Sequence, residues 1–134
     1  MRTKEEIEKD IAGLDKLDTI FYMQKLFDDD VIKNRNLQDI KPEEWIQKQT
    51  LAIVSELAEL LAEVNFKWWK NPKEIDKQNV KEELVDILHF FVGMCLRFGM
   101  TGQELYDIYL KKNEENFKRQ YGTSLKKGYE LSDN

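Results

Sequence analysis

A nearly uninterrupted apolar segment, residues 84–96, constrains the fold of this chain more than any other feature. Asp86 and His89 are its only polar side chains. As a helix, the segment is apolar nearly all round, which is typical of a helix at the centre of a core. A carboxylate there is costly to bury unless a positive charge meets it, and the nearest Lys or Arg in sequence cannot easily do so. The segment therefore predicts a central helix whose charge is met by a cation.

The rest of the chain also carries helix signals. Pro42 suits the first turn of a helix, and Gly99 suits the position just after one. Thr101 and Glu104 form a capping-box pattern. Six Gly and two Pro leave little room for the many turns of an all-β fold. We expect an all-α bundle of four or five helices, with helical stretches at residues 3–34 (weak near Gly13), 43–69, 78–98 and 102–121.

Length and composition indicate one soluble domain, residues 1–134, with residues 122–134 as a loose tail. The net charge of −5 argues against nucleic acid as the main partner. The N-terminus is too charged for a signal peptide, and no apolar run reaches the ~18–20 residues of a membrane span. Cys95 stands alone in an apolar segment, which excludes an intrachain disulfide and favours a core position. We expect a cytoplasmic protein that binds neither nucleic acid nor membrane.

Two acidic pairs, Glu56/Glu59 and Glu83/Asp86, share the spacing i, i+3, which projects two carboxylates from one side of a helix. An ordinary solvated face is the alternative, but such a face mixes charges of both signs. No Lys or Arg occurs between Lys48 and Lys67. Two facing pairs would instead hold one to three hard divalent cations through oxygen ligands.

His89 follows Asp86 with a spacing that resembles half of a di-iron carboxylate site. The second half is missing, because the chain has one His. Oxygen ligation favours Mg²⁺ or Mn²⁺ over iron or zinc. We interpret His89 as a residue of the substrate pocket or of the metal's surroundings, with a metal ligand and a core histidine as alternatives.

Basic and aromatic residues supply a second set of candidates. The segment Phe66-Lys67-Trp68-Trp69-Lys70 is expected at the end of a helix. One of its two indoles would enter the core while the other lines a pocket, or both would lie in the core. Lys112, Asn116 and Arg119, spaced i, i+4, i+7, put an amide between two cations on one helix face, which suits a polyphosphate. A solvated stripe paired with Glu114 and Glu115 is the alternative. No Walker-type glycine loop is present.

These motifs together resemble a known family. Glu56-x-x-Glu59, then 23 residues, then Glu83-x-x-Asp86 is similar to the metal-binding motif of the all-α nucleoside triphosphate pyrophosphatases, the MazG-like superfamily. Residues 66–70, 82–90 and 109–120 resemble the dimeric dUTP pyrophosphatase (dUTPase) branch. The resemblance covers roughly residues 21–129.

The resemblance implies a homodimeric enzyme that hydrolyses dUTP, and often dUDP, to dUMP. It implies two or three Mg²⁺ ions, replaceable by Mn²⁺, on Glu56, Glu59, Glu83 and Asp86, with Glu56 or Glu59 also orienting or deprotonating the attacking water. The implied phosphate-binding residues are Lys70, Lys112, Asn116 and Arg119. The implied base- and sugar-binding residues are Gln24, Trp68, Trp69, His89 and Phe90.

Two departures from the family leave alternatives open. Family members often carry an Asn shortly after the first-helix Gln, where this chain has Phe27-Asp28-Asp29-Asp30. The chain is also shorter than many members of the branch. A related pyrophosphatase that prefers dCTP, or that has a broad preference, is therefore an alternative. The non-enzyme alternatives are a metal-binding helical interaction module and a metal-storage bundle.

Overall fold

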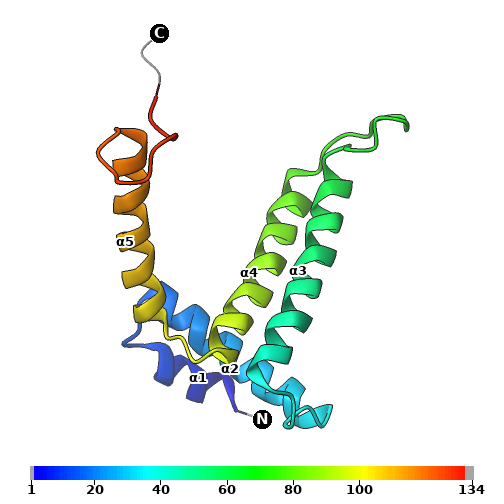
Figure 1. Ribbon diagram of the computed structural model, residues 1–134. Coiled ribbons are helices and arrows are strands. Elements are labelled where there is room, and N and C mark those ends of the chain that lie inside the picture. The colour runs from blue at the N-terminus through cyan, green and yellow to red at the C-terminus, as the bar shows by residue number, and fades with distance from the viewer. Residues whose placement is uncertain (1, 132–134) are drawn as a thin grey trace. The chain divides into compact units, whose positions relative to one another are not determined.

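The computed structural model describes residues 2–131, which form helices and no strands (Figure 1). The all-α prediction is confirmed. The helices are α1 (Lys4–Ile11), α2 (Lys16–Asn34), α3 (Pro42–Glu63), α4 (Lys77–Arg97) and α5 (Gly102–Gln120).

The chain divides into two compact units, Met1–Met100 with α1 to α4 and Thr101–Asn134 with α5. In the second unit, residues 123–131 fold back on the end of α5, where the Ser124 hydroxyl donates to the Glu115 carboxylate. Residues 132–134 of the predicted tail lie outside the described residues. Within residues 2–131, no single helix is long and apolar enough to cross a membrane, although α4 and α5 taken together pass the test on length and composition only.

Side-chain caps explain where most of the helices begin. Asp15 accepts a hydrogen bond from the backbone N–H of Asp18, so the predicted weak point near Gly13 is a break between α1 and α2. Asp76 caps α4 and Thr101 caps α5 in the same way. Pro42 stands in the first turn of α3, as predicted. Gly99 follows α4 with φ of +79°, the left-handed conformation in which glycine ends helices.

Helix α3 is shorter than the helix predicted at residues 43–69. It ends at Glu63 rather than near Trp69, so Trp68 and Trp69 lie in a turn and not on a helix. Asn65 takes a left-handed conformation with φ of +55°. Its side-chain amide donates to the carbonyl oxygen of Lys73 at 2.7 Å, and its oxygen accepts from the Lys73 N–H at 3.0 Å. These two bonds close a loop over residues 66–72.

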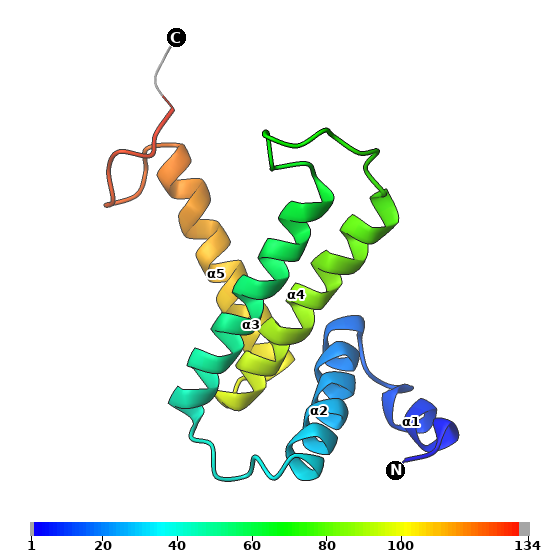
Figure 2. The ribbon, with the colours of Figure 1, turned by 90° about the vertical axis from the view of Figure 1, so that its right-hand side faces the viewer.

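Helix α4 is the centre of the first unit. It runs antiparallel beside α3, and α2 packs against its C-terminal part (Figures 1 and 2). Val92, Gly93 and Cys95 are buried, as the apolar segment predicts for a core helix. The N-terminal half differs from that prediction, since Leu84 and Val85 remain half exposed.

Gly93 marks the closest approach of α4 to its neighbours. A Cβ atom at this position would lie 3.1 Å from Asp28 Oδ2 on α2 and 3.1 Å from Gln49 Nε2 on α3. Both neighbours are polar side chains that are largely removed from solvent. A side chain at position 93 would push against both neighbours, so glycine suits the close approach of the three helices.

The variant Gly93→Val should therefore lower the free energy of unfolding by about 1–3 kcal/mol, the usual cost of overpacking. Chemical denaturation measures this change. Gly13→Val is the control, since no atom lies within 4 Å of a Cβ at that position. Equal stability of the two variants would contradict the close approach.

Candidate active site

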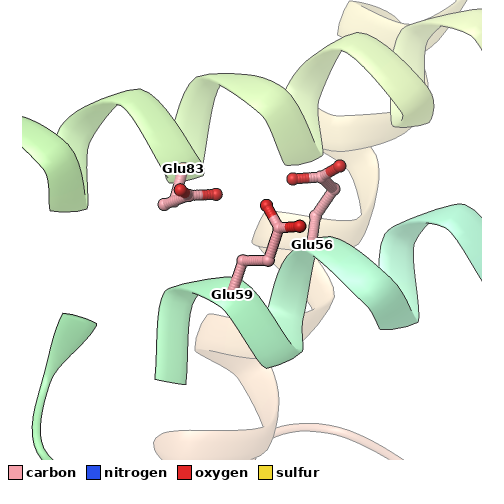
Figure 3. Close-up of side chains that lie close together, drawn as sticks. All are labelled: Glu56, Glu59 and Glu83. Carbon is pink, nitrogen blue, oxygen red and sulfur yellow. The ribbon is translucent and has the colours of Figure 1, made fainter. Parts of the chain in front are cut away.

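Three glutamates converge between α3 and α4. Glu56 and Glu59 stand one turn apart on α3, and the antiparallel α4 brings Glu83 opposite them (Figure 3). One carboxylate oxygen from each of the three lies within 4.8 Å of the other two. The i, i+3 spacing thus produces the convergence of carboxylates that the sequence predicts.

The electrostatics of this cluster are unfavourable without a cation. Glu56 Oε2 and Glu83 Oε2 are buried and have no hydrogen-bond partner among the described residues. Burial, followed by the neighbouring charge of Glu59, raises the pKa of both carboxyls above the ordinary value. No Lys or Arg within residues 2–131 forms an ion pair with any of the three.

A divalent cation fits this donor set. The donors are oxygens of three carboxylates, and Glu56 and Glu83 each have a buried oxygen without a hydrogen-bond partner among residues 2–131. Hard cations such as Mg²⁺, Mn²⁺ and Ca²⁺ prefer oxygen ligands of this kind.

Asp86 lies at the edge of the cluster. Its charge contributes to the raised pKa of Glu56 and of Glu83, which places it nearby. Its side chain is exposed, however, whereas the apolar surroundings in sequence led us to expect a buried carboxylate. The reason is that the N-terminal half of α4 is itself half exposed.

A cavity of about 480 Å³ lies between α2 and α4. Gln24 and His89 both line it, so the structure brings together two of the predicted base-binding residues. Val85 lines this cavity and also a shallower hollow beside Asp86, which puts the two features on adjoining faces of α4. Phe90, Trp68 and Trp69 are not among its lining residues. The walls are otherwise mostly apolar, with Ile20, Met23, Phe27, Val85 and Leu88.

A chain of polar contacts runs from this cavity into the core. His89 Nδ1 lies 2.7 Å from Gln24 Oε1, and Gln24 Nε2 donates to Asp28 Oδ1 at 2.9 Å. Arg97 Nη2 lies 3.8 Å from Asp28 Oδ2. Sequence reasoning found Gln24 and His89 but assigned no role to Asp28 or Arg97. The i, i+4 spacing of Gln24 and Asp28 was the available signal.

The loop after α3 holds the predicted tryptophans. Trp68 and Trp69 are 87% and 59% exposed, so neither indole enters the core of the described chain. Their rings meet edge to face with centroids 5.6 Å apart. Lys70 lines a separate hollow of about 280 Å³ within the same loop.

The predicted phosphate-binding residues of α5 lie on one helix face, in the second unit. Arg119 pairs with Glu115 at 3.4 Å, and its guanidinium lies 5.4 Å from the centroid of the Tyr129 ring. Arg119 therefore fits the alternative in which the basic residues of this helix pair with Glu114 and Glu115. Lys112 and Asn116 are exposed, and Lys112 has no ion pair among residues 2–131.

The chain is similar to a known protein family and to several known proteins. The model of a protein family described as dUTPase matches residues 16–101. A dCTP pyrophosphatase of Enterobacteria phage T4 is 32% identical over 100 residues, covering 57% of this chain and 58% of the phage protein. A dCTP pyrophosphatase of Enterobacteria phage LZ5 is 31% identical, covering 55% of this chain and 43% of that protein.

A DNA replication protein of phage T4 is 30% identical, over 52% of this chain and 24% of that protein. The chain thus spans about half or less of the length of the curated relatives that it matches. No solved structure matches it. The family match includes α2, α3 and α4, which carry the carboxylate cluster and the cavity. Because that match covers well over half of the chain, this protein belongs to the dUTPase family.

Proposed function

We propose that this protein is a metal-dependent pyrophosphohydrolase that converts dUTP or dCTP to the monophosphate and pyrophosphate. The observation that carries the proposal is the cluster of Glu56, Glu59 and Glu83 beside a cavity of about 480 Å³. Membership in the dUTPase family supports dUTP, and the phage relatives named dCTP pyrophosphatase support dCTP. The diphosphate dUDP is a further candidate substrate. The net charge of −5 supports a small-molecule substrate over nucleic acid. We place this activity in the cytoplasm.

Glu56, Glu59, Glu83 and Asp86 would hold Mg²⁺, as two or three ions that Mn²⁺ could replace. Such ions neutralise charge on the phosphate oxygens and lower the pKa of bound water. The buried oxygens of Glu56 and Glu83 without hydrogen-bond partners support this assignment.

The remaining residues divide the other tasks. Glu56 or Glu59 would also orient the attacking water and accept its proton. Gln24 and His89 would bind the base, with Phe90 and the exposed Trp68 and Trp69 closing around base and sugar. Lys70, Lys112, Asn116 and Arg119 would bind the phosphates.

We also propose a homodimer, because α3 carries an uncovered apolar stripe. Leu51, Val54, Ala58 and Leu61 follow the spacing of a coiled-coil seam, and all four are exposed in the described chain. Leu51 alone is 70% exposed. A second copy presenting the same stripe would remove this surface from water.

Glutamate substitution on this stripe should separate the subunits. Leu51→Glu is expected to reduce the mass measured by light scattering from that of two chains to that of one, because a charge would lie in the apolar seam. Lys48→Glu changes an exposed position of α3 outside the stripe and should leave the mass unchanged. A wild-type protein with the mass of one chain would contradict the dimer.

The cluster also predicts how stability depends on pH. Unfolded glutamates ionise near pH 4.5, whereas folded, metal-free Glu56 and Glu83 keep their protons to higher pH. Their stabilising contribution is therefore fully present below pH 4.5 and is lost as the pH rises through the raised pKa. In EDTA, wild type should lose stability relative to Glu59→Gln as the pH rises from 4.5 to neutrality.

Saturating Mg²⁺ should reverse this order, because the wild-type cluster binds the ion and the variant loses a ligand. Denaturation curves at a series of pH values, with EDTA and with Mg²⁺, measure both effects. A difference between wild type and Glu59→Gln that is the same at every pH and in both conditions would argue against the metal site.

Hydrolysis itself separates an enzyme from a metal-binding interaction module. Glu83→Gln should reduce pyrophosphate release by at least about 10- to 100-fold, the loss that is typical even for a residue that only orients a metal ligand. Glu82→Gln is the matched control, because the Glu82 carboxylate accepts from Gln78 Nε2 at 3.0 Å and is not part of the cluster. The assay should compare dUTP, dUDP, dCTP, dTTP and UTP with Mg²⁺. The proposed function would be rejected if none of the five nucleotides were hydrolysed.

A further inference from the structure

We infer that Asp28 is a positioning residue which, through Gln24, fixes the tautomer of His89 and thereby makes the cavity prefer cytosine to uracil. The inference rests on the proposed function, and it selects between the two substrates left open there. It depends on which atoms can donate and which can only accept along the chain Asp28–Gln24–His89.

The direction of the first contact follows from the carboxylate. An ionised carboxylate can only accept hydrogen bonds. The Gln24 amide must therefore turn its NH₂ group toward Asp28, consistent with the 2.9 Å contact from Nε2 to Oδ1. Its carbonyl oxygen then faces His89, at 2.7 Å from Nδ1. Since an amide oxygen only accepts, His89 must carry a proton on Nδ1.

Burial raises the pKa of Asp28 above its ordinary value, and two contacts oppose this rise. Arg97 Nη2 lies 3.8 Å from Asp28 Oδ2, and its charge opposes the rise that burial causes in the pKa of Asp28. The hydrogen bond from Gln24 opposes that rise as well. Gln24 is only 7% exposed, so an amide turned the wrong way would leave buried polar atoms unpaired.

The fixed tautomer determines what the cavity offers to a base. A neutral imidazole with a proton on Nδ1 has a lone pair on Nε2, and no residue within 2–131 hydrogen-bonds to His89 Nε2. Gln24 Oε1 also keeps one free lone pair. Both residues line the cavity, whose other walls are mostly apolar. Thr19, the third polar lining residue, donates its hydroxyl to the Asp15 carbonyl oxygen, so its own oxygen can only accept. The polar part of the cavity thus offers the acceptors Gln24 Oε1, His89 Nε2 and Thr19 Oγ1, with the second N–H of Gln24.

This pattern matches cytosine better than uracil. Cytosine carries an exocyclic amino group, a donor with two N–H bonds, where uracil carries a carbonyl oxygen. The amino group can donate to the acceptors of Gln24 and His89, and the neighbouring ring nitrogen can accept from the Gln24 N–H. Uracil has only its ring N–H to donate, so when its carbonyl oxygen accepts from the Gln24 N–H, one of the acceptors of Gln24 and His89 remains unpaired.

Substitution of Asp28 by Asn should free the Gln24 amide to turn and so free the tautomer of His89. An amide side chain donates as well as accepts, so Gln24 can turn over and donate to His89 Nδ1. The ring then carries its proton on Nε2 and offers a donor, which suits the carbonyl oxygen of uracil. Asp29→Asn is the matched control, because Asp29 Oδ1 also lies near Arg97, at 3.7 Å, but makes no contact with Gln24.

Nitrogen-15 NMR of the imidazole reads the tautomer directly. The chain has one histidine, so an untagged sample gives a single ring to observe. At mildly alkaline pH, where an imidazole is neutral, wild type and Asp29→Asn should show the proton on Nδ1. Asp28→Asn should show it on Nε2 or exchanging between the two. A wild-type proton on Nε2, or no change in Asp28→Asn, overturns the inference.

Titration with dCMP and dUMP, followed through the same ring, tests the base preference. Wild type and Asp29→Asn should bind dCMP about 10- to 100-fold more tightly than dUMP, and Asp28→Asn should lose most of this ratio. A wild-type ratio of one or less, or an unchanged ratio in Asp28→Asn, overturns the preference. Neither measurement needs hydrolysis, so failure of the proposed enzyme activity is observed separately.

Discussion

The repulsion among Glu56, Glu59 and Glu83 is the constraint around which the first unit is arranged. Like charges within 4.8 Å of one another, partly removed from water, favour separation of α3 from α4. The two helices nevertheless run side by side because their apolar residues and the tight approach at Gly93 hold them together. The packing of the two helices therefore holds the carboxylates close together against their repulsion. A cation bound between them would remove this repulsion and so stabilise the folded unit.

Helix α4 connects this charged cluster with the cavity next to it. One side supplies Glu83 to the contact with α3, and another supplies Leu88 and His89 to the cavity shared with α2. Asp86 and His89 are one turn apart on the same helix, so α4 fixes the spacing between the carboxylate cluster and the cavity. Sites carried by regular helices keep their geometry better than sites carried by loops.

The sequence predicted what depends on local spacing and missed what depends on contacts between helices. The helix class and the convergence of Glu56 with Glu59 follow from periodicity. The cap at Thr101 and the first-turn position of Pro42 follow from residue type. The end of α3 at Glu63 does not, because it depends on a bond between Asn65 and Lys73, eight residues away. The role of Asp28 was equally hidden, since its meaning comes from a neighbour on α4. Exposure of Asp86 was mispredicted because an apolar helix was assumed to be covered along its whole length.

The pairing of Asn65 with Lys73 separates two parts of the molecule that could otherwise interfere. Both backbone bonds of Lys73 to the Asn65 side chain fix the base of the 66–72 loop. Changes of sequence within the loop, including at its exposed tryptophans, can then be accommodated without shifting the register of α3 against α4. Glu59 and Glu83 keep their positions while the surface that the loop presents is free to diverge. The fold thus offers a surface segment whose sequence can change independently of the carboxylate cluster.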